Sequence, residues 1–114
     1  MRHTVIVPVY NKPGLSSKCL KGLLNNTGLP ETNIVVVDDH SAQATRRVLL
    51  SLKAQYPQLI LERNSRNLGK PRSVNAVLKR FATSDFFTII DNDVEVLTRG
   101  WDRILVKSHA DWGG

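Results

Sequence analysis

The sequence has a single cysteine, Cys19, among 114 residues, and it has no long apolar run. One thiol excludes an intrachain disulfide and a cysteine-based zinc site. No stretch approaches the roughly 18 consecutive apolar residues that a helix needs to span a bilayer. The N-terminus also lacks the apolar core and cleavage site of a signal peptide. We therefore expect a cytoplasmic protein, and peripheral attachment to a membrane stays open.

Acidic residues are scarce as well. Ten Asp and Glu stand against sixteen Lys and Arg, which gives a net charge of +6. This balance suits a phosphate-bearing partner. Aromatic residues are few and fall in predicted strands rather than in a basic surface stripe, so nucleic acid is not the expected partner. With 41% hydrophobic residues the chain can form one core, and we expect a single domain over residues 1–114.

Short apolar runs alternate with stretches of helical spacing. Runs at residues 5–7, 34–37, 59–61 and 86–90 read as strands, and they are continuous rather than alternating. Such strands indicate a sheet that is covered on both faces. Right-handed crossovers then predict an α/β fold with a doubly wound, mostly parallel sheet. We expect the strand order 3-2-1-4, with ligands bound beyond the carboxyl ends of the strands where the winding reverses.

Local signals also predict where the helices begin. Ser16 or Ser17 is expected to cap the first helix, and Ser41 the second. A last helix is expected around Trp101 and Ile104, where the apolar spacing is again helical.

Half of the acidic residues lie in two short clusters at predicted strand ends. Asp38 and Asp39 follow the second strand, and Asp91, Asp93 and Glu95 follow the fourth. Under the expected order, both clusters open onto one crevice together with the residues after the first strand. Carboxylates gathered there in a basic protein call for compensation by a divalent cation such as Mg²⁺ or Mn²⁺. The alternatives are that these residues are turn residues or solvated loop acids.

A basic stretch supplies the complementary feature. Six cationic side chains fall between the third and fourth predicted strands: Arg63, Arg66, Lys70, Arg72, Lys79 and Arg80. A metal ion beside a cationic loop is what a diphosphate ligand needs.

Five segments, in this order, form a familiar pattern: TVIVPVYN at 4–11, IVVVDDHS at 34–41, Asn67-Leu68-Gly69 with Asn75, FTIIDND at 87–93, and VEVLTRGWD at 94–102. Together they resemble the family 2 nucleotide-sugar glycosyltransferases of the GT-A fold. They are similar to its opening strand, its acidic turn, its N-x-G loop, the strand with its D-x-D motif, and the segment after that motif. The resemblance covers nearly the whole chain, and it is specific only when the segments are taken jointly.

The resemblance implies a role for each matching position. The residues that would bind the nucleotide are Pro8, Tyr10, Asn11, Asp39, Gly69, Lys70, Arg72 and Asp91. Asp39 would accept a hydrogen bond from the base. Asp93, together with Asp91, would hold the Mn²⁺ or Mg²⁺ that bridges the diphosphate. By family analogy the donor would be a UDP-sugar, used for inverting transfer to an acceptor that the sequence does not identify.

Two positions depart from the family pattern. His40 stands where glycine is usual, which puts the geometry of the acidic turn in question. Val74 stands where an arginine is common, and we expect Lys70 or Arg72 to supply that charge.

Family members continue well beyond the D-x-D motif, into a half that binds the acceptor and holds the general base. The sequence ends at Gly114, so we expect the nucleotide-sugar half alone, as a fragment or as a natural short protein. We assign no catalytic base among the candidates Glu95, Asp102, His109 and Asp111. This chain alone is then not expected to transfer sugar unless self-association completes the site. The alternative is a non-catalytic nucleotide-binding module that acts with a partner chain.

Overall fold

A computed structural model describes residues 2–28, 32–94, 100 and 102. Strands and helices alternate along the chain: β1 His3–Val9, α1 Pro13–Asn26, β2 Thr32–Asp38, α2 Gln43–Gln55, β3 Ile60–Arg63, α3 Lys70–Arg80 and β4 Phe86–Ile89. The helix predicted around Trp101 and Ile104 lies outside the described residues. Within the described part of the chain, no helix is long and apolar enough to cross a membrane.

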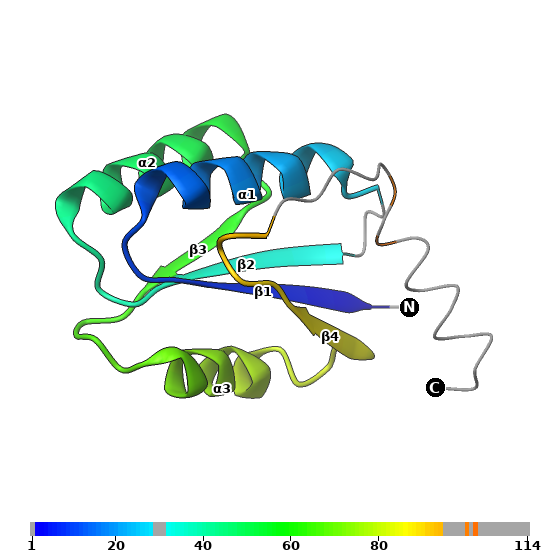
Figure 1. Cartoon of the computed structure of the whole chain (residues 1–114). Coiled ribbons are helices and arrows are strands. Elements are labelled where there is room, and N and C mark those ends of the chain that lie inside the picture. The colour runs from blue at the N-terminus through cyan, green and yellow to red at the C-terminus, as the bar shows by residue number, and fades with distance from the viewer. Residues whose placement is uncertain (1, 29–31, 95–99, 101, 103–114) are drawn as a thin grey trace.

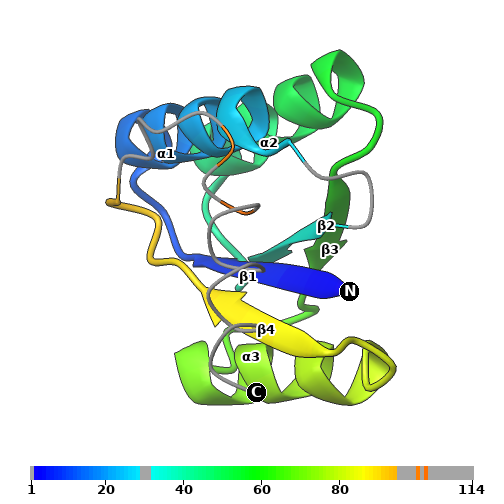
Figure 2. The same ribbon diagram turned by 90° about the vertical axis from the view of Figure 1, so that its right-hand side faces the viewer.

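The four strands form one parallel sheet in the order β3-β2-β1-β4, so the predicted topology is confirmed. His3 pairs with both Thr32 and Phe86, and these three residues therefore mark the amino edge of the sheet. Helices α1 and α2 lie side by side on one face, and α3 covers the other (Figures 1 and 2). Strands β1 and β2 consequently end next to each other, between the two helical layers.

The central strand is buried along its whole length because helices cover both faces of the sheet. Successive side chains of a strand point to opposite faces. Val5 and Val7 accordingly pack in the core beneath α1 and α2, whereas Ile6 packs with Val74 and Val77 of α3. This division explains why the apolar runs in the sequence are continuous rather than alternating.

Both predicted serine caps are wrong. Helix α1 begins at Pro13, which has no N–H to satisfy and a backbone φ already suited to a first turn. Ser16 is buried inside that helix, and its hydroxyl donates to the Asn11 carbonyl oxygen at 3.3 Å. Helix α2 follows Ala42 without a side-chain cap. The Ser41 hydroxyl instead accepts a hydrogen bond from the Asn11 backbone N–H at 2.8 Å, which joins two loops at the carboxyl edge of the sheet.

Candidate functional site

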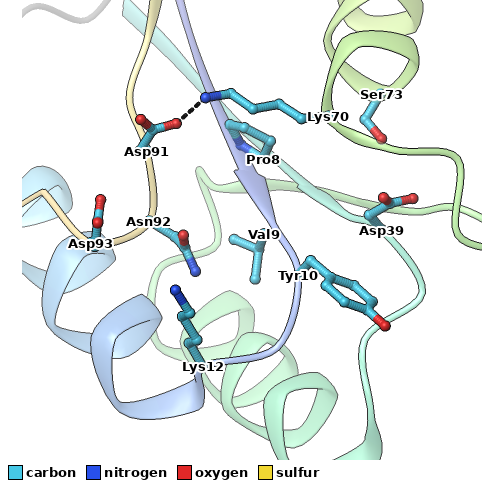
Figure 3. A pocket seen from close by; sticks show the side chains of 10 residues that line it. All are labelled: Pro8, Val9, Tyr10, Lys12, Asp39, Lys70, Ser73, Asp91, Asn92 and Asp93. Carbon is cyan, nitrogen blue, oxygen red and sulfur yellow. Dashed lines mark hydrogen bonds and ion pairs between the residues drawn. The ribbon is translucent and has the colours of Figure 1, made fainter.

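A pocket of about 220 Å³ opens beyond the carboxyl ends of β1, β2 and β4. Its lining residues are Pro8, Val9, Tyr10, Lys12, Asp39, Lys70, Ser73, Asp91, Asn92 and Asp93 (Figure 3). Asp39 and Tyr10 lie on one side of it, and Asp91, Asn92 and Asp93 lie on the other. The structure thus brings together six of the residues singled out from the sequence, and it leaves Asn11, Gly69 and Arg72 outside the lining.

The Asp39 carboxylate organises one end of this pocket. It is almost fully buried, and it accepts hydrogen bonds from the backbone N–H groups of Leu68 at 2.7 Å and Gly69 at 2.9 Å. The Asn64 side-chain amide donates a third bond at 2.9 Å. Burial by itself raises the pKa of this carboxyl, but hydrogen bonding by Leu68, Asn64 and Gly69, with the Ser73 hydroxyl as a further contributor, outweighs it and holds the Asp39 pKa below its ordinary value.

The backbone conformation of Gly69 allows these two neighbouring N–H groups to bind Asp39. Its backbone has φ 88° and ψ 156°, a region that is essentially restricted to glycine. With this conformation the Leu68 N–H donates to Oδ1 of Asp39, and the Gly69 N–H donates to Oδ2. Gly69 therefore acts on the pocket through Asp39.

His40 adopts the conformation that a glycine would take. Its φ is 59°, and its ring Nδ1 lies 3.2 Å from the Asn64 carbonyl oxygen. The residue after Asp39 is therefore in the left-handed region of backbone conformation although it is not glycine. The substitution of histidine for the usual glycine thus leaves the acidic turn in the conformation that a glycine would allow.

The neighbouring acid, Asp38, does not line the pocket. It is buried and forms an ion pair with Arg63 at 2.6 Å, and it also accepts the Ser41 backbone N–H at 2.9 Å. Arg63 additionally donates to the Ser41 carbonyl oxygen. Asp38 thus fixes the acidic turn, while Asp39 faces the pocket.

Asn11 also fixes a loop. Its side-chain oxygen accepts the Ala42 backbone N–H at 2.8 Å, while its own N–H donates to Ser41. Asn11 and Lys12 are consecutive left-handed residues, with φ values of 56° and 58°. This tight bend brings the Lys12 side chain to the pocket, a position that the sequence did not predict.

The opposite end of the pocket is anionic and accessible. Asp91 forms an ion pair with Lys70, and its side chain is 55% exposed. Asn92 donates to the Ser16 hydroxyl at 2.9 Å, which holds the loop after β4 against α1. Asp93 is exposed, and among the described residues its carboxylate has no hydrogen-bond or ion-pair partner.

The donor set at this end suits a particular kind of metal site. The described residues contain no group of three side chains that could enclose an ion. Mg²⁺ and Mn²⁺ are typically held by one or two carboxylates, with phosphate and water oxygens completing the shell. The exposed carboxylates of Asp91 and Asp93 fit an ion that is bound together with a phosphorylated ligand.

Cys19 lies beneath the anionic end. Its Sγ is 3.6 Å from the Asp91 carbonyl oxygen. Burial, reinforced by the charges of Asp93 and Asp91, raises the pKa of the thiol to about 11. Cys19 is therefore a neutral core residue near pH 7 and not a nucleophile.

Asp102 is the one candidate base that the structure describes, and it lies at the other edge of the sheet. It is fully buried, and it accepts hydrogen bonds at 2.8 Å from the Gly28 N–H and from the hydroxyl of Thr32, the first residue of β2. This position excludes it as a base for chemistry in the pocket. Glu95, His109 and Asp111 lie outside the described residues.

The sequence reasoning missed Asn64 and Ser73, which support Asp39. The Asn64 side-chain NH₂ group donates hydrogen bonds to the Asp39 carboxylate and, at 2.8 Å, to the Ser73 hydroxyl. Asn64 directly follows β3. Polar residues directly after the strands were the signal that identified the acids after β2 and β4, and the same signal could have identified Asn64. No signal in the sequence marks Ser73.

Comparisons with known proteins agree with this geometry. The family model "Glycosyl transferase family 2" matches residues 4–112. The chain is 28% identical to poly(ribitol-phosphate) beta-glucosyltransferase of Bacillus spizizenii, over 97% of this chain and 18% of that protein. The structure of mannosyltransferase PcManGT from Pyrobaculum calidifontis, in complex with GDP-Man and Mn²⁺, is similar with a TM-score of 0.81 and 29% identity. That match covers 96% of this chain and 32% of the other.

The crystal structure of S. aureus TarS in complex with UDP-GlcNAc is similar with a TM-score of 0.77 and 26% identity, over 97% of this chain and 31% of the other. The chain therefore spans less than a third of each of these three proteins.

Proposed function

This chain belongs to glycosyl transferase family 2, and we propose that its pocket binds a nucleotide-diphosphate sugar through a divalent metal ion, for inverting transfer of the sugar to an acceptor. The observation that carries this proposal is the division of the pocket into two ends. An ionised, hydrogen-bonded Asp39 lies beside Tyr10 at one end, and the accessible carboxylates of Asp91 and Asp93 lie beside Lys70 at the other.

The Asp39 end has the chemistry to bind a base. The Tyr10 side chain is 54% exposed and can stack on a planar ring. The Asp39 carboxylate lines the pocket and is an acceptor that can receive a ring N–H. Uracil and guanine both present a ring N–H, so this contact alone does not choose between them. We favour uridine, on family analogy.

The other end has the chemistry to hold the diphosphate. Asp93 and Asp91 would hold Mn²⁺ or Mg²⁺, and such an ion supplies charge neutralisation on the leaving diphosphate. Lys70 and Lys12 line the same pocket and add positive charge toward the phosphate oxygens. Arg72 stays a weaker candidate because it does not line the pocket.

The size of the pocket limits what these residues can enclose. Its volume of about 220 Å³ is below the range of about 300–1,000 Å³ that encloses a drug-sized ligand. The described residues can thus surround part of a nucleotide sugar, and the acceptor would bind beyond them. The alternative function, a non-catalytic nucleotide-binding module with a partner chain, uses the same pocket. A cytoplasmic location and self-association stay predictions.

The experiment is calorimetric titration of UDP and GDP, each with Mn²⁺ or with EDTA. We expect UDP to bind with Mn²⁺ and to bind more weakly with EDTA. Asp93→Ala should remove the metal-linked part of the affinity. Asp85→Ala is the matched control, because Asp85 is an exposed acid whose carboxylate accepts the Arg2 N–H near the amino edge of the sheet. Equal UDP affinity with Mn²⁺ and EDTA would contradict the metal role, and no binding of either nucleotide would contradict the proposed function.

A second measurement separates the enzyme from the binding module. The chain is incubated with UDP-sugars, Mn²⁺ and a panel of acceptors, and products are sought by mass spectrometry. Metal-dependent glycosylated product favours the enzyme, with the site complete or completed by self-association. Binding without product is what we expect of this chain alone.

A further inference from the structure

We propose that the ion pair between Lys70 and Asp91 is a latch, which occupies Asp91 when no donor is bound and opens when the diphosphate draws Lys70 away. The inference rests on the proposed function, and it adds a mechanism by which the nucleotide and the metal ion promote each other's binding. Lys70 is then a positioning residue for the metal site as well as a phosphate contact.

The latch crosses the pocket. Lys70 is the first residue of α3, and its side chain extends past Pro8 to the Asp91 carboxylate (Figure 3). The two partners come from opposite sides of the site, one from the helix after β3 and the other from the loop after β4. Both line the pocket, so a ligand that fills the pocket meets the pair.

The pair is also easy to open. The side chains of Lys70 and Asp91 are 52% and 55% exposed, so water screens their attraction. A diphosphate offers several charged oxygens to the same ammonium, and charge-assisted bonds to such oxygens are strong. The Lys70 side chain is long and flexible, and it can exchange one anionic partner for the other without movement of α3.

Opening the latch changes the metal site. In the closed pair, the ammonium of Lys70 and a divalent ion compete for the Asp91 carboxylate. Once Lys70 binds the diphosphate, Asp91 is released and can join Asp93 around the ion. Since linkage is reciprocal, the latch makes nucleotide raise metal affinity by the factor by which metal raises nucleotide affinity.

The test is Mn²⁺ affinity without nucleotide, measured from the electron paramagnetic resonance signal of free Mn²⁺. Lys70→Met keeps a long, unbranched side chain and removes its charge. We expect it to raise Mn²⁺ affinity about two- to fivefold, the factor that corresponds to an exposed ion pair. In titrations with Mn²⁺ present, the same variant should bind UDP more weakly, because the diphosphate has lost its cationic partner.

Two further variants separate a latch from a general loss of positive charge. Lys12→Met removes the same charge from the same pocket, and Lys12 forms no ion pair with the residues that the structure describes. It should raise Mn²⁺ affinity less than Lys70→Met does. In the Asp91→Asn background, Lys70→Met should no longer raise Mn²⁺ affinity, whereas an effect of general charge would persist. Lys79→Met, on an exposed part of α3 away from the pocket, should change nothing.

The outcomes distinguish the two proposals. If the unmodified chain binds neither UDP nor GDP, the proposed function fails. If it binds UDP with Mn²⁺ but Lys70→Met leaves Mn²⁺ affinity unchanged, the latch is wrong. A rise that is equal in Lys12→Met, or that persists in the Asp91→Asn background, would likewise overturn it. So would an absence of Mn²⁺ binding without nucleotide in both the unmodified chain and Lys70→Met.

Discussion

Replacing Asp39 by asparagine should cost stability as well as nucleotide affinity. The Oδ1 atom accepts from Leu68 and Asn64, and Oδ2 accepts from Gly69. An asparagine oxygen placed at the Oδ1 position keeps two of these bonds in weaker, uncharged form, and its NH₂ group then faces the Gly69 N–H. A charge-assisted bond is worth about 1.5–3 kcal/mol and a neutral one about 0.5–1.5 kcal/mol. Two weakened bonds cost about 1–1.5 kcal/mol each and the lost bond costs about 1.5–3 kcal/mol, so we expect Asp39→Asn to lower the free energy of unfolding by about 3.5–6 kcal/mol.

Urea unfolding followed by circular dichroism measures this effect. With a denaturant slope of about 2 kcal/mol per molar, the midpoint should fall by about 2–3 M at pH 7. The Asp39 pKa in the folded chain lies below its ordinary value of 3.8. Its contribution to stability is therefore present above pH 3.8 and is lost as the pH falls through the lower, folded-state pKa. The difference between the unmodified chain and the variant should consequently shrink below about pH 4.

Asp93→Asn is the matched control, because it makes the same chemical change on an exposed carboxylate of the same pocket. It should leave the urea midpoint unchanged. An Asp39→Asn midpoint equal to that of Asp93→Asn would refute the stabilising role assigned to the three N–H donors. If Asp39→Asn instead unfolds more easily but binds UDP with unchanged affinity, the role of Asp39 in base binding is wrong.

Three further predictions concern residues around the site. His40→Gly should change the free energy of unfolding by less than about 1 kcal/mol, because glycine adopts the left-handed backbone without strain, whereas His40→Val should destabilise the fold by about 1–2 kcal/mol in thermal unfolding. Cys19 should react with a thiol reagent at pH 8 about 100-fold more slowly in the folded chain than in urea, as followed by absorbance, since its pKa of about 11 leaves little thiolate. Arg63→Met should lower the urea midpoint by the equivalent of about 2–3 kcal/mol, because it leaves Asp38 buried without its cation; an unchanged midpoint would contradict that role.

The fold could be predicted from the sequence because its strongest signals are global. Continuous apolar runs at 5–7 and 34–37 are typical of strands covered on both faces, and chain topology then restricts the order of the strands. Helix starts could not be predicted in the same way. Ser41 fits a local capping pattern, yet its hydroxyl is engaged by Asn11, 30 residues away in the chain. A contact of that range leaves no local pattern to read.

In the site, too, local sequence patterns predicted where residues gather but not every contact that they make. The position of the strand ends predicted that Asp39, Asp91 and Asp93 would gather at one edge, and they do. This position alone did not distinguish Asp38 from Asp39, and only the family resemblance assigned the base contact to Asp39. Their opposite roles follow from the pleat, which directs one carboxylate to Arg63 and the other to the pocket.

The sequence left open whether Lys70 or Arg72 supplies the positive charge that an arginine often supplies in the family, and the geometry of α3 decides between them. Val74, at the position where the family often has arginine, is buried against Ile6, so this position packs in the core. Of the two cations expected to compensate, only Lys70 lines the pocket. The N-cap at Gly69 determines this choice, because it makes Lys70 the first residue of α3 at the edge of the pocket.

Asp39 and the latch are connected through the chain itself. Asp39 binds the N–H of Gly69, and the next residue, Lys70, pairs with Asp91 across the pocket. Asp39→Asn should therefore disturb two contacts with a nucleotide, its own contact with the base and the position of Lys70 against the diphosphate. Uridine and UDP separate them in calorimetric titrations with Mn²⁺. Loss of the base contact weakens both ligands by the same factor, whereas displacement of Lys70 weakens UDP alone. We expect the affinity for UDP to fall by the larger factor. Equal factors for uridine and UDP would show that the two ends of the pocket are independent.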